Sequence, residues 1–285
     1  MKTLKISGIV LLFAILTIFS QVGGIILILW IIVFNLIKKR ITNKPFRIFT
    51  NYFGFILFYL FFVFIIIPLL AKIQDREPLP FSKSGNLIPV SYWTAILNRN
   101  YIKSEGKIKL EEIANNFEKK YPELKVKYMD CNFPFRINIK GQNNTWILEG
   151  LIPHITHDGN KADIALVYNN EENTPSNLTP TAIGYGSSVL PLSNEKCKPC
   201  YCDKESWQYS FMYRNMPNSN LNFNDKITSN LVEIFISNGA SQIIIEPHLI
   251  QRFKKNSRRI RNFKFSTAEC TSVRHDDHIH AQLCN

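Results

Sequence analysis

The sequence predicts an α+β fold with an antiparallel sheet, preceded by an N-terminal transmembrane helical region. Residues 1–73 hold two long apolar stretches, whereas the rest of the chain alternates helix-type and strand-type patterns. The strand-type patterns are short and separated by polar turns, which is typical of hairpins. Residues 107–285 have the length of one ordinary domain.

The apolar stretches cover residues 6–37 and residues 48–71, and neither contains a charged residue. A membrane-spanning helix needs about 20 apolar residues. Residues 48–71 therefore fit one helix, and residues 6–37 fit either one tilted helix or a short helical hairpin. A cleaved signal peptide over residues 1–20 is disfavoured, because no small-residue cleavage motif ends the apolar run and a second apolar stretch follows.

The distribution of positive charge predicts the orientation in the membrane. The loop at residues 38–47 contains the basic residues Lys38, Lys39, Arg40, Lys44 and Arg47. Basic loops stay in the cytoplasm, so the chain after residue 71 is expected outside it, as the extracytoplasmic (periplasmic) domain of an inner-membrane protein. From Asp75 onward there are 26 basic and 22 acidic residues, and this small excess gives no support to nucleic-acid binding.

Residues 74–106 are polar and contain three prolines, which predicts a linker with some local structure at residues 90–97. Within residues 107–285, apolar residues at helical spacing predict helices and alternating patterns predict strands. Asn224 is expected to cap one of the helices. The expected helices cover residues 109–120, 224–237 and 248–256, and the expected strands cover residues 124–129, 162–168 and 242–246.

Five of the six histidines fall in two clusters, His154 with His157 and His275 with His278 and His280. Side chains alternate along a strand, so His278 and His280 share a face, and His275 can join them only from a loop before the strand. After the first cluster, an Asp-Gly turn precedes Asp163 at the start of the next strand. Imidazole is the commonest protein ligand for zinc, and a carboxylate can complete a site with three ligands. The predicted sheet is therefore expected to carry a zinc site.

These motifs resemble those of the penicillin-insensitive murein endopeptidases, within the wider group of lysostaphin-type and D-Ala-D-Ala metallopeptidases. The resemblance covers residues 152–163 and 243–283. It implies a zinc metallopeptidase that hydrolyses peptide bonds in peptidoglycan, as an endopeptidase on the cross-links. The zinc ligands that it implies are His157, Asp163 and His280. It also implies that His278 is the general base or orients the water, while His275 and His154 line the site.

One spacing departs from the family pattern. Five residues separate His157 from Asp163, where the family has six, although the spacing from Gly159 to Asp163 is kept. Asp158 and Asp276 are the alternative carboxylate ligands. The departure also leaves open a non-catalytic zinc-binding or wall-binding module at the membrane. A third possibility keeps the enzyme but changes its substrate, to that of a D,D-carboxypeptidase or to a peptide outside the wall.

All six cysteines follow the apolar region, and an even number in an exported domain predicts disulfides. The alternative is a zinc site at Cys197, Cys200 and Cys202, which lacks a fourth sulfur ligand. Residues 252–264 are locally basic, and a solvated helix face explains them better than attraction to an anionic wall polymer.

Overall fold

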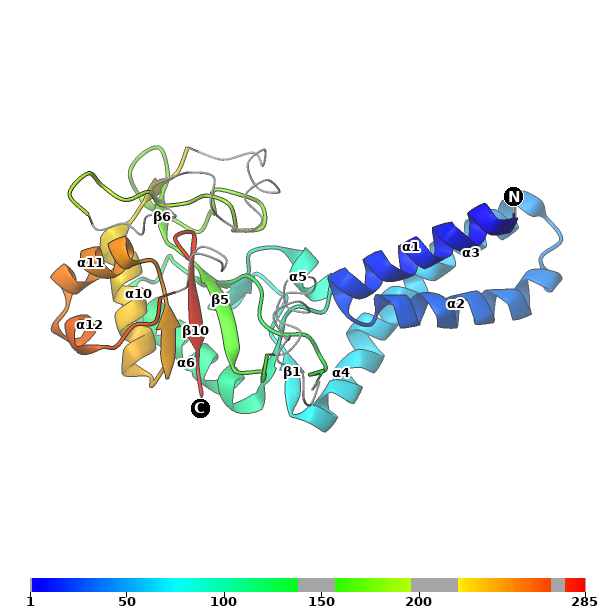
Figure 1. Cartoon of the computed structure of the whole chain (residues 1–285), viewed down its shortest axis with the longest axis horizontal. Helices are drawn as coiled ribbons and strands as arrows, with labels where there is room; N and C mark the ends of the chain where they lie inside the picture. Colours follow the sequence, from blue (N-terminus) through cyan, green and yellow to red (C-terminus); the bar gives the residue numbers. More distant parts are fainter. Residues whose placement is uncertain (1, 138–156, 196–219, 268–274, 285) are drawn as a thin grey trace. The chain divides into compact units, whose positions relative to one another are not determined.

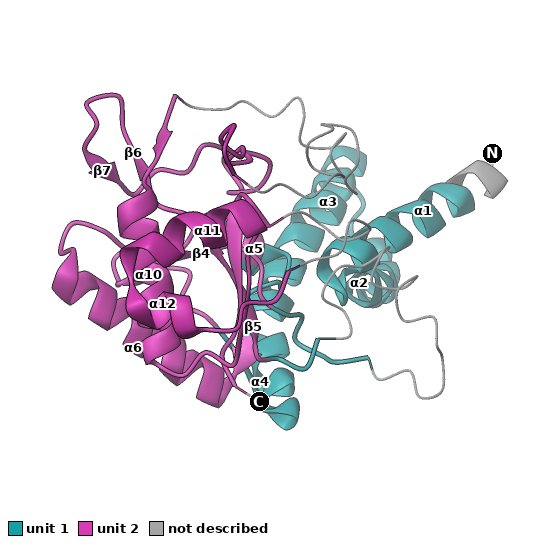
Figure 2. Cartoon of the chain, turned by 60° about the vertical axis from the view of Figure 1, so that its left-hand side comes forward, with its two compact units in different colours: residues 1–78, 95–101, 132–159 teal, residues 79–94, 102–131, 160–285 magenta. Residues whose placement is uncertain are grey.

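The computed structural model describes residues 2–137, 157–195, 220–267 and 275–284 of the chain. These residues form two compact units (Figure 2). Unit 1 consists of Met1–Pro78, Ala95–Tyr101 and Asn132–Gly159. Unit 2 consists of Leu79–Thr94, Ile102–Cys131 and Asn160–Asn285.

Unit 1 is built on the apolar helices (Figure 1). They are α1 (Lys2–Ser20), α2 (Gly23–Ile37), α3 (Lys44–Phe61) and α4 (Ile67–Ala71), with short helical turns at Lys38–Arg40, Phe62–Ile66 and Lys72–Gln74 and strand β1 (Arg76–Pro78) after them. The stretch at residues 6–37 is therefore two helices, which reverse at Gln21 with a φ of 61°. This decides between the two readings of that stretch in favour of the hairpin.

Small residues let the three long helices pack closely. A Cβ atom on Gly24 would lie 2.2 Å from the hydroxyl of Thr17, so α1 and α2 approach each other at that glycine. A Cβ atom on Gly54 would lie 2.4 Å from the Trp30 ring, whose Nε1 donates a hydrogen bond of 3.1 Å to the carbonyl oxygen of Asn51. Close contact of this kind is the main source of helix association where lipid removes the hydrophobic driving force.

Within the described part of the chain, the helical segment Lys44–Gln74 is the one long and apolar enough to cross a membrane by its length and composition. A shorter apolar helix covers Ile6–Ser20. The turn between α1 and α2 is tied to another segment of unit 1, because the Gln21 amide donates to the Phe135 carbonyl (2.6 Å) and accepts from the Phe135 N–H (3.1 Å).

Unit 2 contains a five-stranded sheet of order β2–β4–β5–β10–β9. The strands are β2 (Leu87–Pro89), β4 (Val126–Tyr128), β5 (Lys161–Ala165), β10 (His278–Gln282) and β9 (Gln242–Ile244). Only β2 and β4 pair in parallel, and the other pairs in this sheet are antiparallel. The fold is thus α+β with a largely antiparallel sheet, as the sequence predicts. A smaller sheet joins β7 (Pro175–Ser176), β6 (Tyr168–Asn169) and β8 (Asn222–Phe223).

One face of the large sheet forms the core of unit 2. Tyr128, Ile164 and Ile279 are register partners or neighbours across three strands, and all three are buried with side chains of the helices. The helices are α6 (Ser104–Lys120), α10 (Asp225–Ser237), α11 (Pro247–Asn256) and α12 (Arg258–Asn262). Because strand side chains alternate, the opposite face of β5 and β10 presents Asp163, His278 and His280.

The expected helices and strands are largely confirmed. The Asn224 side chain caps α10 by accepting from the Ile227 N–H at 2.9 Å. The expected strand at residues 162–168 is β5 followed by the short β6, and the expected strand at residues 242–246 ends at Ile244.

The range 74–106 holds more regular structure than a linker. It contains β1, β2, α5 (Tyr92–Ile96) and β3 (Tyr101–Lys103). Leu87 and Ile88 are buried, and β2 adds to the edge of the large sheet beside β4. A strand of three residues is too short to show an alternating pattern, which is why the sequence does not distinguish it from a connection.

Two cysteines fall in the described residues, and no disulfide links Cys131 to Cys284. The other four lie outside the described residues, as does the proposed three-cysteine alternative, so the predicted disulfides involving them stay a prediction.

Candidate metal centre

Strands β10 and β5 bring the second histidine motif against Asp163. His280 pairs with Asp163 in the register of the two strands, and His278 pairs with Ala165. His280 Nδ1 lies 2.6 Å from Asp163 Oδ1, and His278 Nε2 lies 3.8 Å from Asp163 Oδ2. The prediction that His278 and His280 share a face is therefore confirmed.

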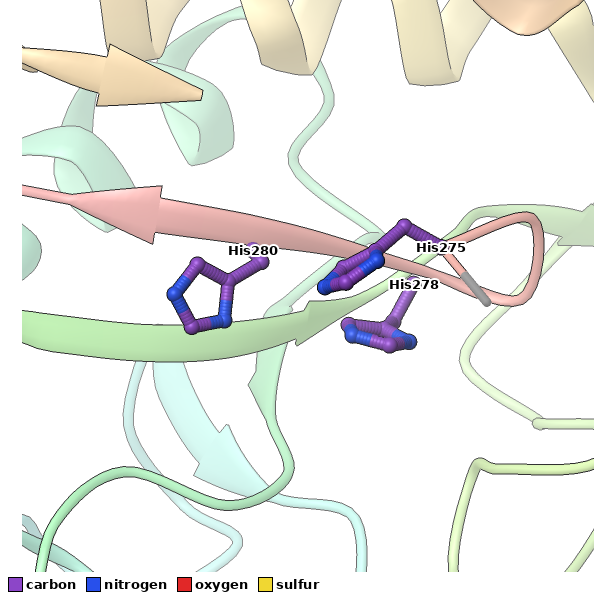
Figure 3. Close-up of side chains that lie close together, drawn as sticks. All are labelled: His275, His278 and His280. Carbon is purple, nitrogen blue, oxygen red and sulfur yellow. The ribbon is translucent and has the colours of Figure 1, made fainter. Parts of the chain in front are cut away.

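His275 joins these two from the loop before β10, as its position in the motif predicts (Figure 3). Its ring centroid lies 4.8 Å from that of His278 and 5.6 Å from that of His280. The three imidazoles offer ligand atoms that all lie within 4.8 Å of one another, and all three residues are buried. Glu246 holds the loop, because its carboxylate accepts from the His275 N–H at 3.2 Å and its own N–H donates to the His275 carbonyl at 3.1 Å.

A second carboxylate contacts His278 from the other side. Asp277 Oδ1 lies 2.5 Å from His278 Nδ1, and an ionised carboxylate can only accept, so the imidazole is the donor. The other oxygen of Asp277 accepts a hydrogen bond of 2.7 Å from the Gly186 N–H. His278 is thus held at Nδ1, and its Nε2 is directed toward Asp163.

Residues 177–190, here called the covering segment, contact the same group of side chains. The Tyr185 hydroxyl donates to Asp163 Oδ2 at 2.6 Å, and its ring lies edge-on to His278 at 5.2 Å between centroids. Val189 N–H donates to the Asp276 carbonyl at 2.9 Å. The glycines on either side of Tyr185 adopt positive φ, 87° at Gly184 and 92° at Gly186. This backbone is strained for any other residue, so the Gly-Tyr-Gly sequence is what lets the tyrosine reach Asp163.

The charged groups around His278 are negative. Burial alone lowers the pKa of the imidazole, but the charges of Asp163, Asp277 and Asp276 outweigh it and raise the pKa of His278 to about 9. Without a metal ion, the imidazole therefore carries a proton at neutral pH. A divalent cation held beside the imidazole would offset these negative charges and so favour the neutral form of His278.

The donor set fits a borderline metal ion. Buried imidazoles with a neighbouring carboxylate suit zinc and similar ions, whereas magnesium and calcium prefer oxygen ligands alone. The cluster His275, His278 and His280 can thus hold a metal, with Asp163 beside it.

Of the six predicted site residues, the structure places four in this group in unit 2: Asp163, His275, His278 and His280. His157 lies in unit 1, where its carbonyl oxygen accepts a hydrogen bond from the Arg76 guanidinium. Its role as a metal ligand stays a prediction. His154 lies outside the described residues.

The two alternative carboxylates are placed differently. Asp158 belongs to unit 1, and Asp276 is fully buried in the loop between His275 and β10.

Two members of the site were not identified from the sequence. Tyr185 sits in a region without periodic pattern, and its one sequence signal is the pair of flanking glycines. Asp277 lies inside the histidine motif, but nothing in the motif shows which of its two aspartates contacts an imidazole.

Comparison with known proteins adds no assignment. No protein-family model matches the chain, and no curated protein matches it.

Proposed function

We propose that this protein is a membrane-anchored zinc metallopeptidase that hydrolyses peptide bonds in peptidoglycan, as an endopeptidase on the cross-links. The observation that carries the proposal is the buried cluster of three histidines on and beside β10, in contact with Asp163 of β5. The resemblance of the two histidine motifs to the murein endopeptidases supports the choice of substrate.

The donor chemistry supports a catalytic site over a structural one. Structural zinc is closed by four protein ligands, most often with cysteine among them. Catalytic zinc is held by three ligands from histidine and a carboxylate, and it keeps one position open. The candidate ligands among the described residues are imidazoles with a neighbouring carboxylate, and no cysteine is among them.

Each described side chain has a specific part in the proposed reaction. A zinc ion held by His280 and Asp163 would supply Lewis acidity, which lowers the pKa of a bound water to about 7, and would leave His278 and His275 free to act on the substrate. His278, directed through Nε2 toward Asp163, takes the proton of the attacking water and returns it to the peptide nitrogen as the carbon–nitrogen bond breaks. His275 lies beside His278, where its imidazole can donate to the oxygen that becomes negative as the peptide carbonyl is attacked.

The membrane anchor supports an extracytoplasmic substrate. The helical segment Lys44–Gln74 precedes all of unit 2 in the chain, and the basic loop at residues 38–47 lies at the start of that segment. A domain exported in this orientation faces the cell wall.

Hydrolysis can be tested with the purified full-length protein in detergent and cross-linked muropeptides, with products weighed by mass spectrometry. We expect cross-linked dimers to yield monomers, a chelator to stop the reaction and zinc to restore it. His280→Ala should be inactive, and Glu172→Gln, at an exposed position, should match the wild type.

The products also separate the alternatives. Release of a terminal D-alanine alone would identify a D,D-carboxypeptidase. Stoichiometric zinc without hydrolysis of any wall fragment would overturn the catalytic proposal in favour of a binding module.

A further inference from the structure

We infer that Asp277 is a positioning residue, which fixes the tautomer of His278 so that Nε2 is the nitrogen available to take a proton. The inference rests on the proposed function for its catalytic meaning. Its structural content, the tautomer of one imidazole, can be measured whether or not the protein hydrolyses anything.

The contact between Asp277 and His278 is short and shielded from water. Asp277 Oδ1 lies 2.5 Å from His278 Nδ1, and the exposed fractions of the two residues are 7% and 2%. A hydrogen bond between an ionised and a polar group is stronger than a neutral one, and burial strengthens it further. The neutral imidazole is therefore held with its proton on Nδ1, which leaves the lone pair on Nε2.

A backbone donor holds Asp277 in this orientation. The Gly186 N–H donates to Oδ2 at 2.7 Å, and a backbone N–H cannot exchange its role for that of an acceptor. Gly186 has a φ of 92°, and the preceding Tyr185 is bonded to Asp163 at 2.6 Å. Adjacent residues of the covering segment thus hold the two carboxylates on either side of His278, one at Nδ1 and one facing Nε2.

This arrangement predicts an unusual effect of replacing the carboxylate with an amide. In Asp277→Asn, the Gly186 N–H still requires an acceptor, so the amide oxygen must face Gly186. The NH₂ group then faces His278 Nδ1, and a donor at that place requires Nδ1 to be the acceptor. The substitution should therefore move the imidazole proton to Nε2 with almost no change in shape.

The experiment uses the full-length protein in detergent, labelled with ¹⁵N-histidine. Long-range ¹H–¹⁵N spectra report which ring nitrogen of each histidine carries the proton, and His278→Gln assigns the His278 signals. Spectra are recorded with zinc bound, and without metal over a range of pH, so that the tautomer is assigned where the spectra themselves show a neutral imidazole. We expect protonated Nδ1 in the wild type and protonated Nε2 in Asp277→Asn.

Kinetics supply the second readout. General acid–base catalysis contributes about 10²–10⁴-fold, so kcat of Asp277→Asn should fall at least about 100-fold while KM and zinc content stay near wild type. Glu172→Gln, which removes a carboxylate from an exposed turn, is the matched control and should change neither readout.

Two results would overturn the inference. One is a His278 tautomer that is the same in the wild type and in Asp277→Asn. The other is a loss of activity in Asp277→Asn that follows loss of zinc or of the fold, without a tautomer change. A tautomer change in a protein that hydrolyses no muropeptide would instead uphold the positioning role of Asp277 and reject the proposed function.

Discussion

The imidazole Nδ1 of His280 lies 2.6 Å from Oδ1 of Asp163, although 117 positions separate the two residues in the chain. The antiparallel pairing of β10 with β5 is what brings them together, because His280 and Asp163 are register partners. A slip of one residue in this register would turn both histidines of β10 toward the core. The register of β10 on β5 therefore determines whether the side chains of the site lie together.

This contact predicts that Asp163 is required for metal binding. We expect Asp163→Ala and His280→Ala each to abolish high-affinity zinc binding, because each removes a donor from a site with few ligands. Asp158→Ala should largely retain zinc, and so should Asp276→Ala if that buried side chain can be removed without unfolding. Metal analysis of the purified variants checks this. Retention of zinc by Asp163→Ala together with its loss from Asp158→Ala would show that the carboxylate ligand is Asp158.

The conformation of the covering segment predicts that substitution of Gly184 destabilises the protein. Gly184 has a φ of 87°, and a Cβ atom there would lie 2.8 Å from Met129 Cε. Gly184→Ala should therefore lower the free energy of unfolding by about 1–3 kcal/mol. Gly85→Ala is the matched control, since its nearest neighbour would be a backbone oxygen at 3.7 Å and no positive φ is required. Urea titrations of both variants give the comparison, and equal stabilities would contradict the packing described for Gly184.

The buried Lys127 predicts a stability that rises with pH. Burial lowers the pKa of Lys127 from 10.5 to about 7, and its ammonium donates to the Leu178 carbonyl at 2.9 Å. Between these pH values the unfolded chain binds a proton that the folded chain lacks, so the free energy of unfolding increases as the pH rises from about 7 toward 10.5. Below pH 7 the full cost of burying the charge is present.

Replacing this lysine with methionine tests the argument. Lys127→Met should be more stable than the wild type at pH 6, by about 1–4 kcal/mol, as found when buried charges are replaced by apolar groups of similar size. The advantage should shrink as the pH rises. Lys119→Met, at an exposed helix position, is the control and should leave the wild-type pH dependence unchanged. A variant that is less stable than the wild type at every pH would show that the bond to Leu178 outweighs the cost of burial.

The hairpin of α1 and α2 predicts on which side of the membrane its turn and the basic loop lie. In the proposed membrane topology, the bonds between Gln21 and Phe135 require the turn at residues 21–22 to lie on the same side as residues 132–137. The basic loop at residues 38–47 is expected on the cytoplasmic side. A single cysteine introduced at the exposed position 136 or 137 should react with an impermeant thiol reagent in intact cells, and one introduced at position 40 should not. The labelling would be done in a chain whose native cysteines are replaced by serine.

A reporter that is active only outside the cytoplasm gives an independent check. Fused after Lys107 it should be active, and fused after Arg40 it should be inactive. The reverse pattern would remove the cell wall as the substrate.

Local patterns in the sequence were enough to predict several parts of the molecule. The two-residue period of a strand placed His278 and His280 on one face, and the same period assigned His275 to the preceding loop. A polar residue before a helical pattern identified Asn224 as a cap, and the charge-free stretches identified the apolar helices. Each of these inferences depends on residues within about one turn or one strand of each other, where backbone geometry relates sequence spacing directly to position in space.

Only the tertiary structure identified the contacts that join distant segments. Tyr185 reaches Asp163 over 22 positions, and Gly186 reaches Asp277 over 91. The path of an irregular segment depends on glycines at positive φ and on the surface that it covers, and no periodic pattern encodes either of them. The strand β2 was not predicted for a related reason. A strand of three residues can be recognised only from its pairing with a neighbour, here β4. The sequence alone therefore determined which residues are candidates for a metal site, and the packing of the covering segment on β5 and β10 decided which side chains orient them.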